Sequence, residues 1–251
     1  EDLLFINNIP CYTTEHTVKG FKFEIFERIG WDDRVGATYL VQAGDKELVM
    51  RVGMDKHSIV AAETLFLNKA DTRGLWPHFS QVHSSWQMDG LQYLTVYFRP
   101  GPSLRQIVDF MPGHKFSLGT VARFGKDILK CLQCAHSLGY VARCLNIELF
   151  HFCAASRHLF MADISNIRLD PTSFGHSAAA WTGGNLLSPL RSHKGEGLAR
   201  GDELESFLYL LVLLFTNQLP WDSVYADQIE DVKKSTDVVE GLGSSWKQLK
   251  E

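Results

Sequence analysis

Apolar and polar residues alternate over much of the first hundred residues. At Gly20–Ile25 every second side chain is apolar, and the stretches 37–41, 47–52 and 91–98 are rich in β-branched and aromatic residues. Both patterns are typical of strands. Residues 58–69 carry apolar side chains at helical spacing instead. The first part of the chain is therefore predicted to form a small antiparallel sheet with one helix.

Helical spacing takes over after Pro100-Gly101-Pro102, which marks a boundary between two lobes. Residues 103–110 read as a short helix with a serine cap, and 120–138 as a longer amphipathic one that a glycine ends. Residues 203–216 are apolar on nearly all sides, so we expect this helix at the centre of the second lobe. Two short strands are expected at residues 149–152 and 159–161.

Composition and charge exclude several classes of protein. The chain has 251 residues, and its formal net charge of −4 gives no basic surface for nucleic acid or an anionic membrane. Its longest apolar run, Phe207–Phe215, is much shorter than the ~20 residues that cross a bilayer. The N-terminus lacks the basic region and cleavage site of a signal peptide. We therefore expect neither a nucleic-acid partner nor membrane insertion.

The five cysteines indicate a reducing compartment. They are Cys11, Cys131, Cys134, Cys144 and Cys153. An odd number without a disulfide framework favours an intracellular protein, cytoplasmic or nuclear. Cys131 and Cys134 form a CxxC inside a helical pattern with no second pair, so we interpret them as core residues rather than as metal ligands.

Four short strings follow one another in the second part of the chain. They are Gly101-Pro102-Ser103-Leu104, Ala135-His136-Ser137-Leu138-Gly139-Tyr140, Gly201-Asp202-Glu203-Leu204-Glu205-Ser206 and Asn217-Gln218-Leu219-Pro220-Trp221. In this order they resemble the casein kinase 1 group of protein kinases, with its tau-tubulin kinase and vaccinia-related kinase branches. The resemblance implies an α+β, bilobal fold. Residues 17–98 would be the N-lobe, 99–251 the C-lobe without the family's last helices, and 1–16 an N-terminal extension.

The resemblance places a degenerate phosphate-binding loop between Gly30 and Gly36. The middle glycine of G-x-G-x-x-G is missing, the spacing is one residue longer, and two aspartates stand where phosphates would lie. Arg51 occupies the position of the phosphate-binding lysine, and Glu63 matches its helical partner. Arginine keeps the charge and can pair with Glu63, but it places that charge on phosphate less well than lysine does.

The hinge positions also depart from the family. Tyr97 stands at the gatekeeper position, where its bulk would narrow the pocket behind it. Pro100 falls near the hinge position whose backbone N–H donates to adenine, and proline has no N–H to donate. Asp163 survives from the D-F-G motif, followed by Ile164 and Ser165. A single carboxylate is a weak magnesium site and could equally accept backbone hydrogen bonds.

The resemblance aligns residues 139–150 with the catalytic loop. Cys144 replaces the aspartate that accepts the substrate proton, Asn146 replaces the lysine, and Leu149 replaces the asparagine that binds metal. Cys144 could be a nucleophile only beside a base such as His136 or His151, and a packed cysteine is the alternative.

Three further positions follow the resemblance along the second lobe. They are the activation segment at Ser173–Gly184, the A-P-E anchor near Ser188-Pro189-Leu190, and the central-helix aspartate, now Glu203.

The positions for phosphate, metal and base are altered, whereas the strings that mark the fold are retained. This combination implies a pseudokinase. It would act as a scaffold or allosteric regulator by binding an unidentified protein partner. We expect no catalytic residue and no metal or other cofactor. Two alternatives stay open. One is a sensor domain that binds ATP without transfer, and the other is a weakly active serine/threonine kinase with an atypical site. The nucleotide-site remnants are Gly30, Gly36, Arg51, Glu63, Tyr97, Pro100 and Asp163.

Overall fold

The structure is a computed structural model that describes residues 3–18, 20, 22–32, 36–54, 58–170 and 180–238. Contacts within the chain divide it into two compact units, residues 1–100 and 101–251. The division falls inside the Pro-Gly-Pro sequence, where a proline and a glycine favour a change of direction.

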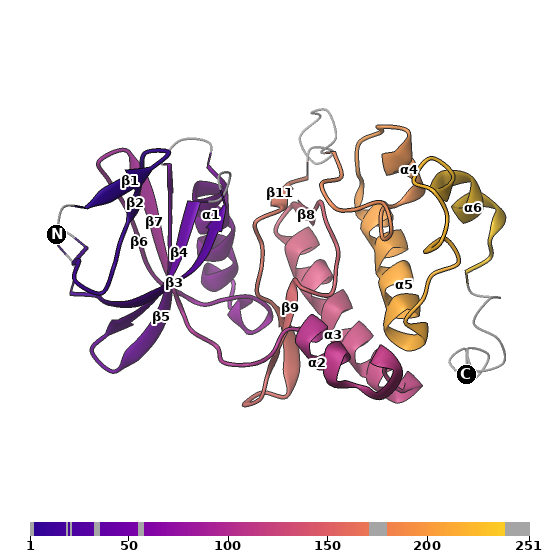
Figure 1. The fold of residues 1–251 in the computed structure, drawn as a ribbon, viewed down its shortest axis with the longest axis horizontal. Helices are drawn as coiled ribbons and strands as arrows, with labels where there is room; N and C mark the ends of the chain where they lie inside the picture. The colour runs from indigo at the N-terminus through magenta and orange to yellow at the C-terminus, as the bar shows by residue number, and fades with distance from the viewer. Residues whose placement is uncertain are drawn as a thin grey trace. The chain divides into compact units, whose positions relative to one another are not determined.

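The first unit is built on a five-stranded antiparallel sheet with the strand order β3-β4-β5-β7-β6. The strands are β3 (Glu24–Asp32), β4 (Gly36–Ala43), β5 (Lys46–Met54), β6 (Val82–Met88) and β7 (Leu91–Tyr97). Helix α1 (Ile59–Thr72) lies against β5, β6 and β7, and a single 3-10 turn, η1 (Trp76–His78), follows it (Figure 1). The Ser58 side chain caps α1 by accepting a hydrogen bond from the N–H of Ala61.

The two faces of this sheet have different neighbours. Tyr39 of β4 is paired with Met50 of β5, and both are completely buried on the same face. Because side chains alternate along a strand, Arg51 points to the other face, where it reaches Glu63 of α1. The sheet therefore buries apolar residues on one side and receives α1 on the other.

The N-terminal residues cover the apolar face. β1 (Leu4–Ile6) and β2 (Ile9–Cys11) form a hairpin, and β2 packs on β4 and β5. Ile9 and Tyr12 are part of the same buried cluster as Tyr39. The Tyr39 hydroxyl donates to the Pro10 carbonyl at 2.8 Å and accepts from the Tyr12 N–H at 3.2 Å. The expected extension is thus a structural layer of the first unit.

Two strand predictions in this unit were incomplete. The strand expected at Gly20–Ile25 begins at Glu24 and continues to Asp32, because Gly20 has the positive φ of a turn. Strand β6 was not predicted, because most of its residues are polar or half-buried and show no clean alternation. Its turn was visible in the sequence: Asp89 and Gly90 both have positive φ, as an Asp-Gly hairpin requires.

The second unit is mainly helical. Its helices are α2 (Leu104–Phe110), α3 (Leu118–Ser137), α4 (Leu190–His193), α5 (Arg200–Thr216) and α6 (Ile229–Ser235), with a 3-10 turn η2 (Pro112–His114). Helices α3 and α5 pack side by side (Figure 1). Gly125 permits this contact, because a Cβ there would lie 2.8 Å from Leu211 Cδ2. The prediction that residues 203–216 form a central, buried helix is confirmed, although α5 begins at Arg200.

Short antiparallel pairs complete the second unit. β9 (Phe150–Cys153) pairs with β10 (His158–Met161), and β8 (Tyr140–Ala142) with β11 (Ile167–Leu169). The serine cap of α2 is confirmed, since Ser103 and Gln106 form a capping box. Helix α3 starts two residues earlier than predicted because Ser117 caps it. β8, β11, α4 and α6, each of three to seven residues, were not predicted.

Within the described ranges, the helices are all too short or too polar to traverse a lipid bilayer.

The Tyr39 hydroxyl tests whether the N-terminal layer stabilises the first unit. We expect Tyr39→Phe to lower the free energy of unfolding by about 1–3 kcal/mol, because it leaves the Tyr12 N–H and the Pro10 carbonyl without their partner. Tyr225→Phe is the control, since Tyr225 is 79% exposed. Urea unfolding checks both variants, and equal midpoints would contradict a structural role for this layer.

Candidate functional site

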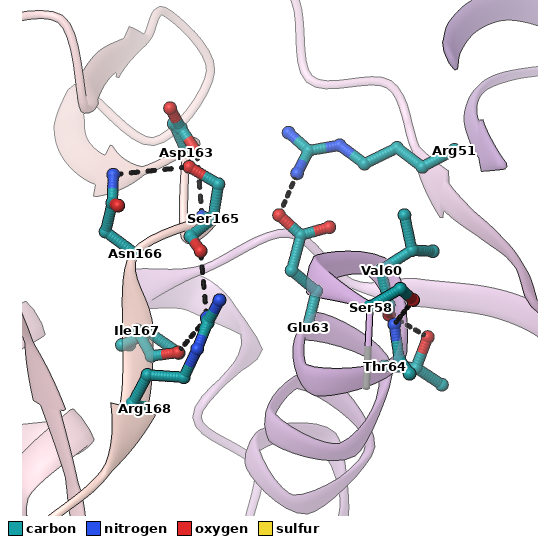
Figure 2. Close-up of polar contacts among 11 residues, drawn as sticks. Arg51, Ser58, Val60, Glu63, Thr64, Asp163, Ser165, Asn166, Ile167 and Arg168 are labelled. Atoms are coloured by element: carbon teal, nitrogen blue, oxygen red, sulfur yellow. Dashed lines mark hydrogen bonds and ion pairs between the residues drawn. The ribbon is translucent and has the colours of Figure 1, made fainter. Parts of the chain in front are cut away.

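The expected pair between Arg51 and Glu63 is present in the first unit. An Arg51 guanidinium nitrogen, Nη1, bonds to Glu63 Oε1, and Figure 2 shows the two side chains directed at each other. Glu63 is completely buried on α1, and Arg51 is 19% exposed on β5. A buried carboxylate needs such a partner, because leaving it unpaired would be strongly destabilising. The pair therefore has a structural reason to exist, whatever binds near it.

The two outer glycines of the expected phosphate loop have different roles. Gly30 lies in β3, where an added Cβ would make ordinary contacts of 3.5 Å with Thr38. Gly36 begins β4 with φ +103°, and a Cβ there would lie 2.0 Å from the Val52 carbonyl oxygen. Residues 33–35 between them lie outside the described residues. Packing of β4 on β5 is thus sufficient to explain why residue 36 is glycine.

The hinge positions are engaged inside the first unit. The Tyr97 N–H donates to the Gln81 carbonyl at 3.0 Å, and the Phe98 N–H donates to the Glu47 carbonyl at 3.0 Å. The Tyr97 ring packs edge-on against His83, and Lys46 Nζ lies 5.6 Å from its centroid. Pro100 ends the unit. The N–H groups of Tyr97 and Phe98, three and two residues before Pro100, are therefore already used within the first unit.

The loop between β8 and β9 folds around Asn146. Its Oδ1 accepts from the N–H groups of Glu148 and Leu149 at 2.8 and 3.2 Å, and its Nδ2 donates to Cys144 Sγ at 3.4 Å. Cys144 is 6% exposed and Leu149 is 4% exposed. Burial raises the pKa of the Cys144 thiol, so it stays neutral near pH 7.

The arrangement supports the packed-cysteine interpretation. Of the two candidate bases, His136 bonds to Glu203, and His151 Nδ1 lies 3.3 Å from the Gly101 carbonyl. Burial lowers the pKa of His151. A thiol with a raised pKa and an amide partner has no activated thiolate, so the geometry offers no nucleophile at Cys144.

Asp163 is used locally by the backbone. Its Oδ1 accepts from the Ser165 N–H at 2.8 Å, as Figure 2 shows, and its own N–H donates to the Leu149 carbonyl at 3.3 Å. This bears out the interpretation that the carboxylate caps nearby backbone. Across the described parts of the chain, histidine, cysteine, aspartate and glutamate nowhere gather in threes that could bind a metal ion.

Glu203 on α5 binds to His136 on α3, and both helices contact β8. Its carboxylate is completely buried. Burial raises the pKa of Glu203, and the His136 ring opposes that rise. Glu203 therefore joins α5 to the end of α3, just before the loop at residues 139–150.

Lys233 on α6 is a buried cation that the sequence did not reveal. It is 3% exposed, and its Nζ donates to the carbonyls of Asn185 and Ser188 at 2.7 and 2.6 Å. The same atom lies 5.1 Å from the ring centroids of Tyr209 and Trp221. A lysine next to a second lysine in a polar helix gives no periodic signal for burial, so only the fold could identify it.

Several curated proteins resemble this chain over part of its length. A probable casein kinase I homologue of Encephalitozoon cuniculi is 28% identical over 153 residues, which is 56% of this chain and 50% of that protein. Casein kinase I homologue 2 of Schizosaccharomyces pombe is 25% identical and covers 61% of this chain and 39% of its own length. The piRNA biogenesis factor prde-1 of Caenorhabditis elegans is 21% identical over 87% of this chain and 47% of its own length.

The chain thus spans half or less of these relatives, and no family model matches it. The structure of vaccinia related kinase 3 superposes with a TM-score of 0.68 at 18% identity, covering 85% of this chain and 71% of the other. These matches confirm the predicted α+β, protein kinase-like fold and its relation to the casein kinase 1 group.

Alanine at Gly30 and at Gly36 tests which of the two glycines the packing of the sheet requires. We expect Gly36→Ala to lower the free energy of unfolding by about 2 kcal/mol or more, because the new Cβ overlaps the Val52 carbonyl and the φ is strained. Gly30→Ala should change it by less than about 0.5 kcal/mol. Thermal and urea unfolding measure both. Equal effects would mean that β4 packing does not require glycine at residue 36.

The pH dependence of stability reports the burial of Lys233. Burial lowers the pKa of this lysine from 10.5 to about 8, so between these values the unfolded chain binds more protons than the folded one. Its contribution to the free energy of unfolding therefore rises as pH increases from 8 towards 10.5. We expect the free energy of unfolding of the natural protein to increase relative to that of Lys233→Met between pH 7 and 9.5, as measured in urea titrations. Lys234→Met, which removes a surface pair with Glu230, should show an almost constant difference.

Proposed function

We propose that this chain, with its kinase-like fold of the casein kinase 1 group, is a pseudokinase that acts by binding a protein partner, as a scaffold or an allosteric regulator. One observation carries the proposal. The residue at the position of the catalytic base, Cys144, is a buried neutral thiol whose hydrogen-bond partner is Asn146. Phosphate transfer to a hydroxyl needs an acceptor for its proton at that position, and a thiol with a raised pKa is a poor one.

Loss of metal ligation adds to loss of the base. Leu149 has no ligand atom, so Asp163 alone keeps a carboxylate at the two metal-binding positions. Phosphoryl transfer relies on metal ions to neutralise the charge that develops on the phosphate oxygens. Without base and metal ligand together, we expect the rate to fall by several powers of ten, which corresponds to about 4 kcal/mol or more in the barrier. The retained positions have structural explanations, as Gly36 and the pair of Arg51 with Glu63 illustrate.

Two features support binding to another protein. The net charge of −4 gives no basic surface for nucleic acid. Of the relatives named above, the one that aligns over 87% of this chain is named for piRNA biogenesis and not for kinase activity. A kinase-like domain without phosphate transfer keeps a large, stable surface on which other proteins can assemble.

A second candidate, ATP binding with weak or no transfer, has its own support. The pair of Arg51 with Glu63 is formed, and it is the kind of ion pair that active kinases need. Asp163 keeps a carboxylate at the metal position, and several relatives are named as kinases.

Transfer of labelled phosphate from ATP tests the proposal directly. We expect no transfer to the chain itself or to casein above a reaction without protein, because base and metal ligand are missing. Asp163→Asn should behave like the natural protein. An active casein kinase I in the same buffer is the positive control. Transfer that disappears in Asp163→Asn would show a kinase with a rearranged site.

Thermal unfolding with ATP, with and without Mg²⁺, separates the remaining candidates. No shift of the melting temperature at millimolar ATP supports a scaffold that does not use nucleotide. A shift that needs no metal supports the ATP sensor. A shift that requires Mg²⁺, together with transfer, supports the weakly active kinase.

A further inference from the structure

Helix α3, with 20 residues, has one face in solvent. The exposed positions recur every three or four residues, as one side of a helix does. They are Gly119, Ala122, Arg123, Lys126, Leu129, Lys130, Gln133 and Ser137. Other sides of α3 pack on α5, β8 and β10. Packing inside the second unit therefore does not decide which side chains occupy the exposed face.

The charged residues of this face are all positive. They are Arg123, Lys126 and Lys130, which follow one another at i, i+3 and i+7, within about 10 Å along the helix axis. The one acidic residue of α3, Asp127, has a side chain that is 12% exposed and lies 2.9 Å from the ring of His158. The three cations form a basic stripe on a chain whose formal net charge is −4.

The cations of the basic stripe have no acidic partner within 4.0 Å among the residues that the structure describes. Arg123 donates to the Arg157 carbonyl at 2.8 Å, and Lys130 donates to Gln133 Oε1 at 2.9 Å, so both acceptors are neutral. Residues three and four positions apart on a helix have Cβ atoms about 5–6 Å apart, and like charges there repel each other. The basic stripe therefore weakens α3 instead of stabilising it.

A leucine and a fourth cation adjoin the basic stripe. Leu129 is 41% exposed on the same face, beside Lys126 and Lys130. Arg157 is exposed in the turn between β9 and β10, and its carbonyl is the one that Arg123 binds. A ligand lying along α3 would therefore meet positive charges around one apolar side chain. Interfaces between proteins have the same arrangement, with an apolar centre and a polar rim.

We propose that the exposed face of α3 is a docking surface for an acidic segment of a protein partner. Its glutamate or aspartate side chains would pair with the basic stripe, and an apolar side chain would pack on Leu129. The inference rests on the proposed function, because it names the chemistry of the partner that a scaffold or regulator requires. Ion pairs with such a segment would replace the like-charge repulsion of the free chain, and complementary charge would give specificity and fast association.

Nucleic acid fits this surface less well than an acidic protein segment does. Three cations within two helical turns can neutralise few phosphates, and binding to nucleic acid depends on the number of phosphates neutralised. The chain as a whole is also acidic, with a formal net charge of −4, which repels a long polyanion.

Fluorescence anisotropy with a labelled synthetic peptide of glutamate pairs separated by single leucines tests the docking surface. We expect saturable binding to the natural protein that weakens as salt is added, because salt screens exposed charges. The variant Arg123→Gln, Lys126→Gln, Lys130→Gln should bind at least about tenfold more weakly. It should unfold at the same or a higher urea concentration, because the repulsion on α3 is removed. Glutamate at the same three positions should transfer binding to a peptide with lysine in place of glutamate.

A matched control removes the same charge from other parts of the surface. Lys22, Arg73 and Lys194 are exposed, and no ion pair involves them in the described ranges. The variant Lys22→Gln, Arg73→Gln, Lys194→Gln should bind the acidic peptide within about twofold of the natural protein, because distant exposed charges are largely screened.

Three results would overturn the docking surface. The natural protein could show no saturable binding to the acidic peptide, or the control variant could lose as much affinity as the α3 variant. A short DNA duplex could also bind more tightly than the peptide in the same buffer, which would indicate a nucleic-acid surface. Peptide binding is measured without ATP, so phosphate transfer by the natural protein would refute the proposed function without altering this result. Failure to bind the peptide would likewise leave the absence of transfer unchanged.

Discussion

A single buried carboxylate organises the second unit. Glu203 is completely buried on α5 and binds to His136 on α3, and both helices contact β8. Because a carboxylate without partners in such a place would be strongly destabilising, α3 and α5 are held together at this point. β8 packs on both helices, and the loop that makes the contacts of Asn146 and Thr182 follows it.

The same physical argument distinguishes residues that the fold requires from residues that only phosphate transfer requires. Residues that a kinase uses for phosphate transfer also make contacts that stabilise its fold. Such a residue can be replaced only where another residue makes the stabilising contact instead. At residue 144 a thiol fills space under Gly183, and at residue 146 an amide closes the turn that leads to Leu149. Where the structural part is indispensable, the residue type persists, as at Glu63 and Gly36. Retention of a motif residue is therefore weak support for activity.

Sequence predicted the long elements and the family, but not the contacts that close the site. Periodicity identified α1, α3, α5 and the central strands, because each presents several buried positions. The resemblance also predicts that Cys144 stands at the base position. It could not show that Gly183 lies on that thiol, because the two stretches are far apart in the chain. Lys233 stayed hidden for a related reason: its carbonyl partners belong to a loop without any sequence signature.

The N-terminal layer and the loop at residues 185–188 share a physical principle. Each covers a surface that would otherwise need a partner, and each does so with backbone hydrogen bonds fixed by one polar side chain, Tyr39 in the first unit and Lys233 in the second. Backbone groups must be satisfied wherever they are buried, so such a side chain sets which segment can lie there. A peptide that bound in the same place would have to replace those hydrogen bonds one for one. Binding by other proteins is thus favoured at surfaces that the chain itself leaves uncovered.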